Sequence, residues 1–243
     1  MTPRLAAIHR HPIKGIGRER LAAVDLIAGA PMPGDRAWAL LHENAPQRDG
    51  WQARRNFLVV ASGPDLARIE AEGLGPITLH HPARPDLTFD PAGESSRLAD
   101  WVRPIWPADR PAPTRLVKAP PQGMGDNGEP QVAILNLASL RALSQKIGRP
   151  LDIERFRGNL IVDDLPPWGE FDWIGRQIRI GAVTLDVTDP IGRCRATEAS
   201  PETGTRDANV LRTLDDGWGH QNFGVYATVN VAGRLAVGDG VQE

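Results

Sequence analysis

Cysteine is almost absent from this chain of 243 residues: only Cys194 is present. A single cysteine excludes an intrachain disulfide framework, a zinc site made of several cysteines and a self-contained iron–sulfur cluster. Lysine is also rare, because all but three of the 28 basic residues are arginine. Genome composition is the simplest explanation of the arginine excess. The alternative is that some arginines serve as planar donors to carboxylate or phosphate.

Long apolar runs are absent as well. No stretch of about 18 apolar residues occurs anywhere, so we expect no membrane span. Residues 1–15 lack the apolar segment of a signal peptide, and together with the single cysteine this favours a reducing, cytoplasmic compartment. The net charge of −2 gives no argument for nucleic acid or a membrane surface as partner. The apolar share of 41% and the charged share of 24% are typical of a soluble globular protein.

Three familiar catalytic motifs are missing. The six histidines form neither HExxH nor another paired-ligand spacing, so a zinc hydrolase is unsupported. The glycine patterns of a phosphate-binding P-loop and of a dinucleotide-binding fold are also absent. A Cys–His hydrolase, with His220 as the base for Cys194, stays a minor alternative because the sequence gives no geometry for the pair.

The chain is divided into short segments by 25 glycines and 22 prolines. Between them lie apolar, β-like runs at a spacing of roughly ten residues, which is typical of a barrel or sandwich. We therefore predict a mainly β, α+β protein. The predicted strands are 5–10, 37–42, 57–62, 76–80, 87–90, 114–118, 159–163, 177–181, 183–188 and 223–231.

Helical signals are few. The segment 136–148 is the strongest, with Asn136 as N-cap, an apolar stripe and Gly148 as C-cap. Weaker predictions are a short helix over 97–106, stopped by Pro104, and one over 207–214 with Asp207 as N-cap. Residues 118–130 are rich in proline and glycine, the composition of a linker or functional loop. We place the boundary between two subdomains there, giving 1–120 and 121–243.

Cys194 stands between Arg193 and Arg195. A lone cysteine is ordinarily an inert, buried side chain. Flanking arginines lower the pKa of a thiol only if their side chains approach it, and in a strand they would face away from the sulfur. Gly192 and the pair Asp189-Pro190 favour a turn just before the cysteine. We therefore consider a thiol at the end of a loop, close to backbone N–H groups.

Lys14 lies in 11–17, on a predicted turn between Pro12 and the glycines Gly15 and Gly17. Glycines let the backbone approach a ligand closely, so this lysine is a candidate contact for phosphate or another anion. The competing interpretation is a solvated lysine on a turn.

Further basic and amide side chains lie where apolar strands begin. Arg36 precedes one predicted strand, and Arg157 with Asn159 precede another. Such side chains are often satisfied surface groups, but an arginine there can also reach into a cleft and bind phosphate through two donors. Arg54 and Arg55 add two arginines in a weaker context.

Taken in order, the segments 11–21, 34–40, 156–163, 192–207 and 223–241 resemble the MOSC domain proteins, named for the C-terminal domain of molybdenum cofactor sulfurase. Residues 1–120 look like the β-barrel domain that often precedes the MOSC domain. The resemblance implies a MOSC β-barrel core over 121–243. By pattern, the nearest functional relatives are the amidoxime-reducing component of mitochondria and its bacterial counterparts.

The resemblance also implies site residues. Cys194 matches the cysteine whose thiolate ligates molybdenum, and a soft thiolate suits a metal already held by the dithiolene sulfurs of molybdopterin. The family positions that hold the phosphate and pterin of the cofactor match Lys14, Arg36, Arg157 and Asn159. Gly192 and Arg193 match the loop that approaches the metal, and Asn136 matches a further cofactor contact. The relatives have serine where this chain has Gly15 and Gly192. Two hydroxyl hydrogen bonds to the cofactor are therefore missing or supplied by backbone N–H groups or water.

By this resemblance we expect a molybdenum cofactor-dependent reductase that removes oxygen from a small N-hydroxylated substrate. Its electrons would come from a separate ferredoxin-, flavin- or cytochrome-type protein, because we expect neither an iron–sulfur domain nor a membrane anchor here. One alternative is a cofactor carrier or sulfur-transfer module that holds a persulfide on Cys194. Another is an anion-binding barrel with an inert cysteine.

Overall fold

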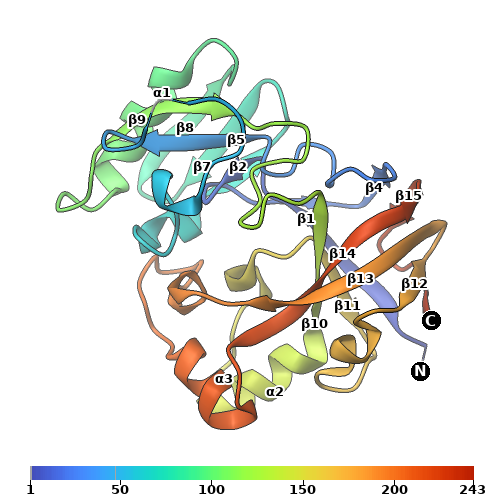
Figure 1. The fold of residues 1–243 in the computed structure, drawn as a ribbon. Helices are drawn as coiled ribbons and strands as arrows, with labels where there is room; N and C mark the ends of the chain where they lie inside the picture. Colours follow the sequence, from blue (N-terminus) through green and yellow to red (C-terminus); the bar gives the residue numbers. More distant parts are fainter. Residues whose placement is uncertain (1, 47) are drawn as a thin grey trace.

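The computed structural model describes residues 2–46 and 48–243. Its largest element is an open sheet of eight strands in the order β16-β12-β13-β14-β10-β11-β1-β3 (Figure 1). Only β10 and β11 run parallel, and the other neighbours are antiparallel. The strands are β1 (Arg4–Arg10), β3 (Glu19–Leu21), β10 (Gln131–Asn136), β11 (Leu160–Asp163), β12 (Gln177–Ile180), β13 (Val183–Gly192), β14 (Asn222–Val231) and β16 (Val241–Gln242).

The parallel pair needs a crossover, which helix α2 (Leu137–Ile147) provides. Asn136 and Gly148 cap this helix as predicted: the Asn136 side chain accepts from the Ala138 N–H, and Gly148 is left-handed. Helix α3 (Val210–Trp218) packs beside α2, and an apolar cluster around Leu135, Leu143 and Phe223 lies between these helices and the sheet. A second apolar cluster, around residues such as Leu160 and Val225, forms a separate core on this sheet.

The remaining strands belong mostly to the N-terminal half, most of which, apart from the strands that join the large sheet, forms the upper part of Figure 1. One sheet contains β2 (Ile13–Lys14), β5 (Trp38–His42) and β9 (Pro113–Lys118). Another contains β6 (Glu70–Glu72), β7 (Ile77–His81) and β8 (Arg84–Phe89), and helix α1 (Ser95–Val102) packs with β9. Strand β4 (Ala23–Leu26) pairs with β15 (Gly233–Ala236). The short 3-10 helices are η1 (Arg54–Asn56), η2 (Pro64–Arg68), η3 (Arg103–Ile105), η4 (Ile153–Phe156), η5 (Gly169–Trp173) and η6 (Arg195–Glu198).

The predicted α+β class is confirmed, but the expected barrels are not found. In the described ranges every sheet is open, and the large sheet ends at β16 and β3. Alternating apolar residues specify which face of a strand is buried, but they do not specify whether the first and last strands pair. The large sheet also includes β1 and β3 from the N-terminal half, so a boundary at residue 120 divides it. The two-subdomain division stays a prediction.

Three local predictions are wrong. In 57–62 only Phe57 forms a bridge, with Leu41, and the following buried residues make a turn in which Ser62 and Gly63 donate to the Val59 carbonyl. Asp207 does not cap α3; its carboxylate accepts from Arg155 at 2.7 and 3.0 Å instead. The turn predicted before Cys194 is absent, because β13 continues to Gly192. The strand accommodates Pro190 where its register with β14 shifts.

The two ends of the chain lie close together. The backbone N–H of Leu5 donates to the Asp239 carbonyl at 2.8 Å, and the termini are neighbours in Figure 1. None of the helices in the described part of the chain has the length and apolar character needed to cross a membrane.

Candidate functional site

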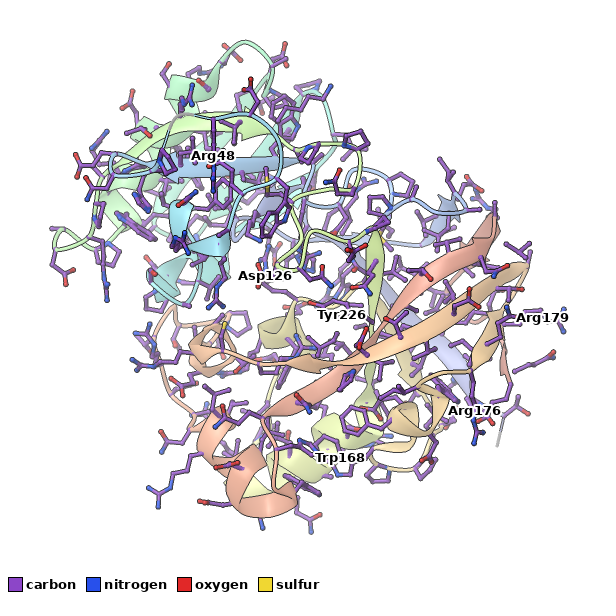
Figure 2. The ribbon with its side chains drawn as sticks, viewed as in Figure 1. Arg48, Asp126, Trp168, Arg176, Arg179 and Tyr226 are labelled. Carbon is purple, nitrogen blue, oxygen red and sulfur yellow. The ribbon has the colours of Figure 1, made fainter. Side chains whose placement is uncertain are left out.

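A cavity lies between the N-terminal half and the large sheet. Figure 2 labels Asp126 and Tyr226, two of its lining residues, at this junction. The fold brings together eight of the nine predicted site residues on its walls, which are Lys14, Gly15, Arg36, Arg157, Asn159, Gly192, Arg193 and Cys194. Asn136 is the ninth and does not line the cavity.

The cavity carries an excess of positive charge. Six basic residues line it against three acidic ones: Lys14, Arg36, Arg54, Arg155, Arg157 and Arg193 against Asp35, Asp126 and Glu129. Because charges in a partly enclosed cleft are screened less than on an open surface, this excess favours an anionic ligand.

Arg36 and Arg157 both have left-handed backbones, each with φ of 48°. This conformation is uncommon for residues other than glycine, so surrounding contacts must hold it. The Arg36 guanidinium donates to the Asp35 carboxylate and to the Arg157 carbonyl, at 3.0 Å in the second case. Asp35 in turn accepts from the His11 N–H at 2.7 Å. These bonds connect the two strained turns and fix both arginines at the cavity.

The electrostatic settings of these two arginines differ. Burial opposes the charge on Arg36, but Asp35, Tyr226 and Asp126 together outweigh it, and the pKa of Arg36 is raised. Burial lowers the pKa of Arg157 to about 9, and the nearby Arg36 adds to this effect. The Arg157 guanidinium donates only to the carbonyls of Ile13 and Gly17, at 3.5 and 3.2 Å. Within the described residues, no carboxylate lies within 4 Å to balance its charge.

Arg193 is also a half-buried cation without an acidic partner among the described residues. Its guanidinium donates to the carbonyls of Phe156 and Phe223, each at 2.8 Å, and lies over both aromatic rings. Burial lowers its pKa to about 10. Arg195, by contrast, is exposed and pairs with Glu198 at 3.0 Å. The two arginines that flank the cysteine therefore have different surroundings, and only Arg193 lines the cavity.

Cys194 lies between the end of β13 and the start of η6, on the cavity wall and partly exposed. Its backbone is extended, with φ −126° and ψ 175°. Its carbonyl accepts hydrogen bonds from the N–H and the hydroxyl of Thr197, at 3.1 and 3.0 Å. The cysteine is thus held by a strand on one side and a short helix on the other.

Gly15 and Gly192, where the family resemblance leads us to expect serine, differ in how much space surrounds them. Gly15 has φ of +75°, and a Cβ added there would lie 2.5 Å from the Leu58 carbonyl oxygen. Real Cβ atoms do not approach backbone this closely, so the local packing requires glycine. At Gly192 the nearest atom to an added Cβ is the Asn222 Oδ1 at 3.7 Å, an ordinary contact. A side chain therefore fits at Gly192 but not at Gly15.

Lys14 is buried beneath the loop of residues 119–130. Its Nζ donates to the Met124 carbonyl at 2.7 Å and to the Asp126 carboxylate. Burial lowers the pKa of Lys14, and the Asp126 carboxylate partly offsets that lowering. The proline- and glycine-rich loop predicted from the sequence thus covers the lysine with a carboxylate of its own.

The two predicted asparagines are used within the protein. Asn136 caps α2 and donates to Glu170 at 2.8 Å, which explains why it is fully buried away from the cavity. Asn159 lines the cavity, but its side-chain oxygen accepts from the Ala133 N–H at 3.0 Å and its amide donates to the His9 carbonyl at 3.2 Å. Asn159 therefore joins neighbouring strands of the large sheet.

The structure adds residues that the sequence did not single out. Asp35 and His11 form the hydrogen-bonded support of Arg36, while Asp126 and Tyr226 line the cavity. The position of Asp35 next to Arg36 was an available signal; the others come together only in the fold. His220, the alternative base, does not line the cavity, and its ring packs edge-on against Trp168 and Phe171.

No cluster of three or more His, Cys, Asp or Glu side chains suited to a metal occurs in the described ranges. A metal ion here would therefore need ligands beyond such side chains, as a metal carried by an organic cofactor has.

Comparison with known proteins places these features in a family. A molybdenum cofactor sulfurase of Anopheles gambiae is 36% identical over 115 residues, covering 42% of this chain and 15% of the mosquito protein. Molybdenum cofactor sulfurase 3 of Aedes aegypti is 25% identical over 267 residues, covering 92% of this chain and 34% of its own length. The chain thus matches only a minor part of these longer proteins.

Among solved structures, the YuaD protein of Bacillus subtilis aligns over 99% of this chain and 94% of its own, with 12% identity and a TM-score of 0.47. The model of the MOSC domain family matches residues 117–242, just over half of the chain. The chain therefore belongs to the MOSC domain family.

Proposed function

We propose that the chain binds the molybdenum cofactor in this cavity and acts with it as a reductase of N-hydroxylated compounds. The observation that carries the proposal is the presence of two half-buried arginines, Arg157 and Arg193, on the same cavity wall as the only thiol of the chain. Neither guanidinium has a carboxylate partner among the described residues, so both are available to an anionic ligand beside Cys194.

The donor set of the cavity fits this cofactor. Molybdopterin has a phosphate, which guanidinium groups bind through charge-assisted and often bidentate hydrogen bonds. A thiolate is a soft ligand and suits a metal whose other ligands are sulfurs. When bound, the cofactor supplies a molybdenum centre capable of two-electron oxygen transfer, while the protein supplies binding and orientation.

The residues of the chain would then have separate tasks. Cys194 would ligate the metal as the thiolate, and Arg157 and Arg193 would hold the anionic part of the cofactor. Asp35 fixes Arg36 beside them. Lys14 would join them once Asp126 releases its Nζ, since a phosphate and a carboxylate on the same cation repel each other.

Electrons are proposed to come from a separate ferredoxin-, flavin- or cytochrome-type protein. One cysteine cannot hold an iron–sulfur cluster within this chain. The substrate would be a small molecule that enters the cavity beside Cys194.

A second candidate function is a cofactor carrier or sulfur-transfer module. It is favoured by the names of the relatives, which are molybdenum cofactor sulfurases, and by the partial exposure of Cys194. In this case Cys194 would hold a persulfide, and the protein would bind cofactor without reducing a substrate.

The test begins with purification from a molybdenum-competent host and analysis of metal and pterin. We expect about one molybdenum per chain, and we expect Cys194→Ala to abolish reduction of benzamidoxime by an artificial electron donor. Arg157→Ala should lower cofactor content, whereas the exposed Arg212→Ala serves as the matched control. A loaded protein that is inactive with every donor and carries a persulfide supports the carrier. A protein without metal or pterin contradicts both functions.

A further inference from the structure

A second cleft adjoins the cofactor cavity. Arg54, Val59 and Ala61 line both, so the two spaces share a wall at 54–61. The second cleft is formed by the segment 53–62, by His42 at the end of β5, and by residues 106–111. A ligand held in the cleft therefore lies next to the cavity that contains Cys194.

The charge of the cleft is entirely positive. Arg54, Arg55 and Arg110 line it together with His42, and no acidic residue does. All three arginines are exposed, and none forms a salt bridge with a described residue. Many exposed arginines elsewhere pair with a carboxylate, as Arg97 does with Glu94 at 2.8 Å, and those that form no salt bridge with a described residue, such as Arg48, Arg115 and Arg179, do not line this cleft. Three unpaired guanidinium groups around one concave surface favour a ligand that carries an acid group.

The wall of the cleft is aromatic and fixed. Trp106 and Phe57 are largely buried, and the Trp106 Nε1 donates to the Pro111 carbonyl at 3.0 Å, which holds the indole ring in place. Flat apolar walls of this kind suit an aromatic or aliphatic ligand body. The ligand that matches the cleft is thus an amphipathic anion rather than a simple ion.

His42 adds a polar group with an unused nitrogen. Its Nε2 contacts the Arg55 carbonyl at 2.7 Å, which places the proton of the neutral ring on Nε2. Nδ1 is buried and has no hydrogen-bond partner within the described residues. A buried nitrogen of this kind costs free energy unless a ligand satisfies it. His42 therefore adds to the cleft wall a ring whose second nitrogen has no partner among the described residues, beside the three arginines.

We propose that this cleft binds the acid group, a carboxylate or a phosphate, of a small organic substrate. The apolar body of the substrate lies along Trp106, and its other end reaches past Val59 and Ala61 into the cavity beside Cys194. The role of the reacting end rests on the proposed function, whereas binding of the acid group does not. In this arrangement Arg55 and Arg110 determine which substrates bind and take no part in the chemistry.

The first experiment measures binding without turnover. Isothermal titration compares benzamidoxime with its 4-carboxy and 4-phosphate derivatives, using wild-type protein and the double variant Arg55→Ala/Arg110→Ala. The exposed double variant Arg97→Ala/Arg212→Ala is the matched control, because it removes the same charge elsewhere. Arg54 is left unchanged since it also lines the cofactor cavity.

We expect the acidic ligands to bind wild type at least about tenfold more tightly than benzamidoxime, a preference that charge-assisted contacts with Arg55 and Arg110 together can supply. The cleft variant should lose that preference, and the control should keep it. The tighter of the two acidic ligands identifies the acid group. Equal binding of acidic and neutral ligands to wild type, or an equal loss in the control, overturns the proposal.

The second experiment uses cofactor-loaded protein. For the 4-carboxy substrate, the cleft variant should raise KM with kcat unchanged, which is the signature of lost uniform binding. For benzamidoxime, neither constant should change. If wild type turns over no substrate, the proposed function fails. The titration still shows whether the cleft binds the acid group. A fall in kcat for both substrates would contradict a role confined to substrate choice.

Discussion

At the scale of single residues, the two glycines at the cavity have opposite tolerance for a side chain. We predict that Gly15→Ser lowers the free energy of unfolding by roughly 2–3 kcal/mol, because it combines a left-handed backbone with a clash against the Leu58 carbonyl. Gly192→Ser should stay within about 0.5 kcal/mol of wild type, since the nearest atom is 3.7 Å from the added Cβ. Urea unfolding of both variants measures the difference. Equal destabilisation of the two would contradict this account.

Eight of the nine residues predicted for the site line the cavity, but the sequence does not show how each side chain is used. Arg193 and Arg195 are equivalent in sequence, and only burial between Phe156 and Phe223 separates the first from its exposed neighbour. Asn159 is predicted to contact a cofactor, and it lines the cavity. Its amide groups nevertheless bond the backbone of adjacent strands, a requirement set by tertiary contacts that no local pattern contains.

At the scale of elements, the loop of residues 119–130 controls access to Lys14. Asp126 occupies the Lys14 Nζ, and this ion pair keeps the pKa of the Asp126 carboxyl low although burial opposes it. We predict that Asp126→Asn tightens binding of inorganic phosphate by about 5- to 10-fold, because the lysine is freed and a repelling carboxylate is removed.

The matched control for this prediction is Glu129→Gln. It removes an equal charge from the same loop, at an exposed carboxylate that also lines the cavity. Titration calorimetry at two salt concentrations measures both variants, since general charge effects weaken with salt. If Glu129→Gln tightens phosphate binding as much as Asp126→Asn does, the effect is one of net charge and the loop has no specific role.

The elements predicted best are those with a local signal. Helix α2 has a capping asparagine, an apolar stripe and a terminal glycine, and all three appear as predicted. Strand β10 has no such signal, because it is buried on both faces and its residues do not alternate between apolar and polar. The apolar run 57–62 has the composition of a strand but forms a turn. Its apolar character reflects burial, and burial alone does not distinguish a strand from a turn.

At the scale of the whole molecule, the site exists only because distant segments meet. His11 shows this, since its ring nitrogens lie 3.4 Å from the Gly17 carbonyl and 3.2 Å from the Gly158 carbonyl, joining the start of the chain to the segment that carries Arg157. Sequence patterns extend over one element and cannot predict such contacts, which is why the cavity itself and the open shape of the large sheet were not predictable.

The same histidine makes the stability of the molecule depend on pH. Burial lowers the pKa of His11 well below its ordinary value of 6.5, and the charges of Arg157 and Arg36 lower it further. Burial also lowers the pKa of His9, against an opposing effect of Glu154. Below pH 6.5 the unfolded chain takes up protons that these buried rings do not. Their contribution to the free energy of unfolding is therefore full above pH 6.5. It is lost as the pH falls towards the pKa values that the two histidines have in the folded protein.

We predict that the free energy of unfolding falls between pH 6.5 and 5, by up to about 1.4 kcal/mol per pH unit for each histidine. His11→Gln keeps a neutral side chain able to bond both carbonyls and does not titrate, so it should reduce this slope even if it lowers stability at pH 7. Urea unfolding at half-unit pH intervals gives both slopes. A slope unchanged by His11→Gln would show that protonation of His11 does not cause the loss of stability at low pH. Other titratable groups would then be responsible for that loss.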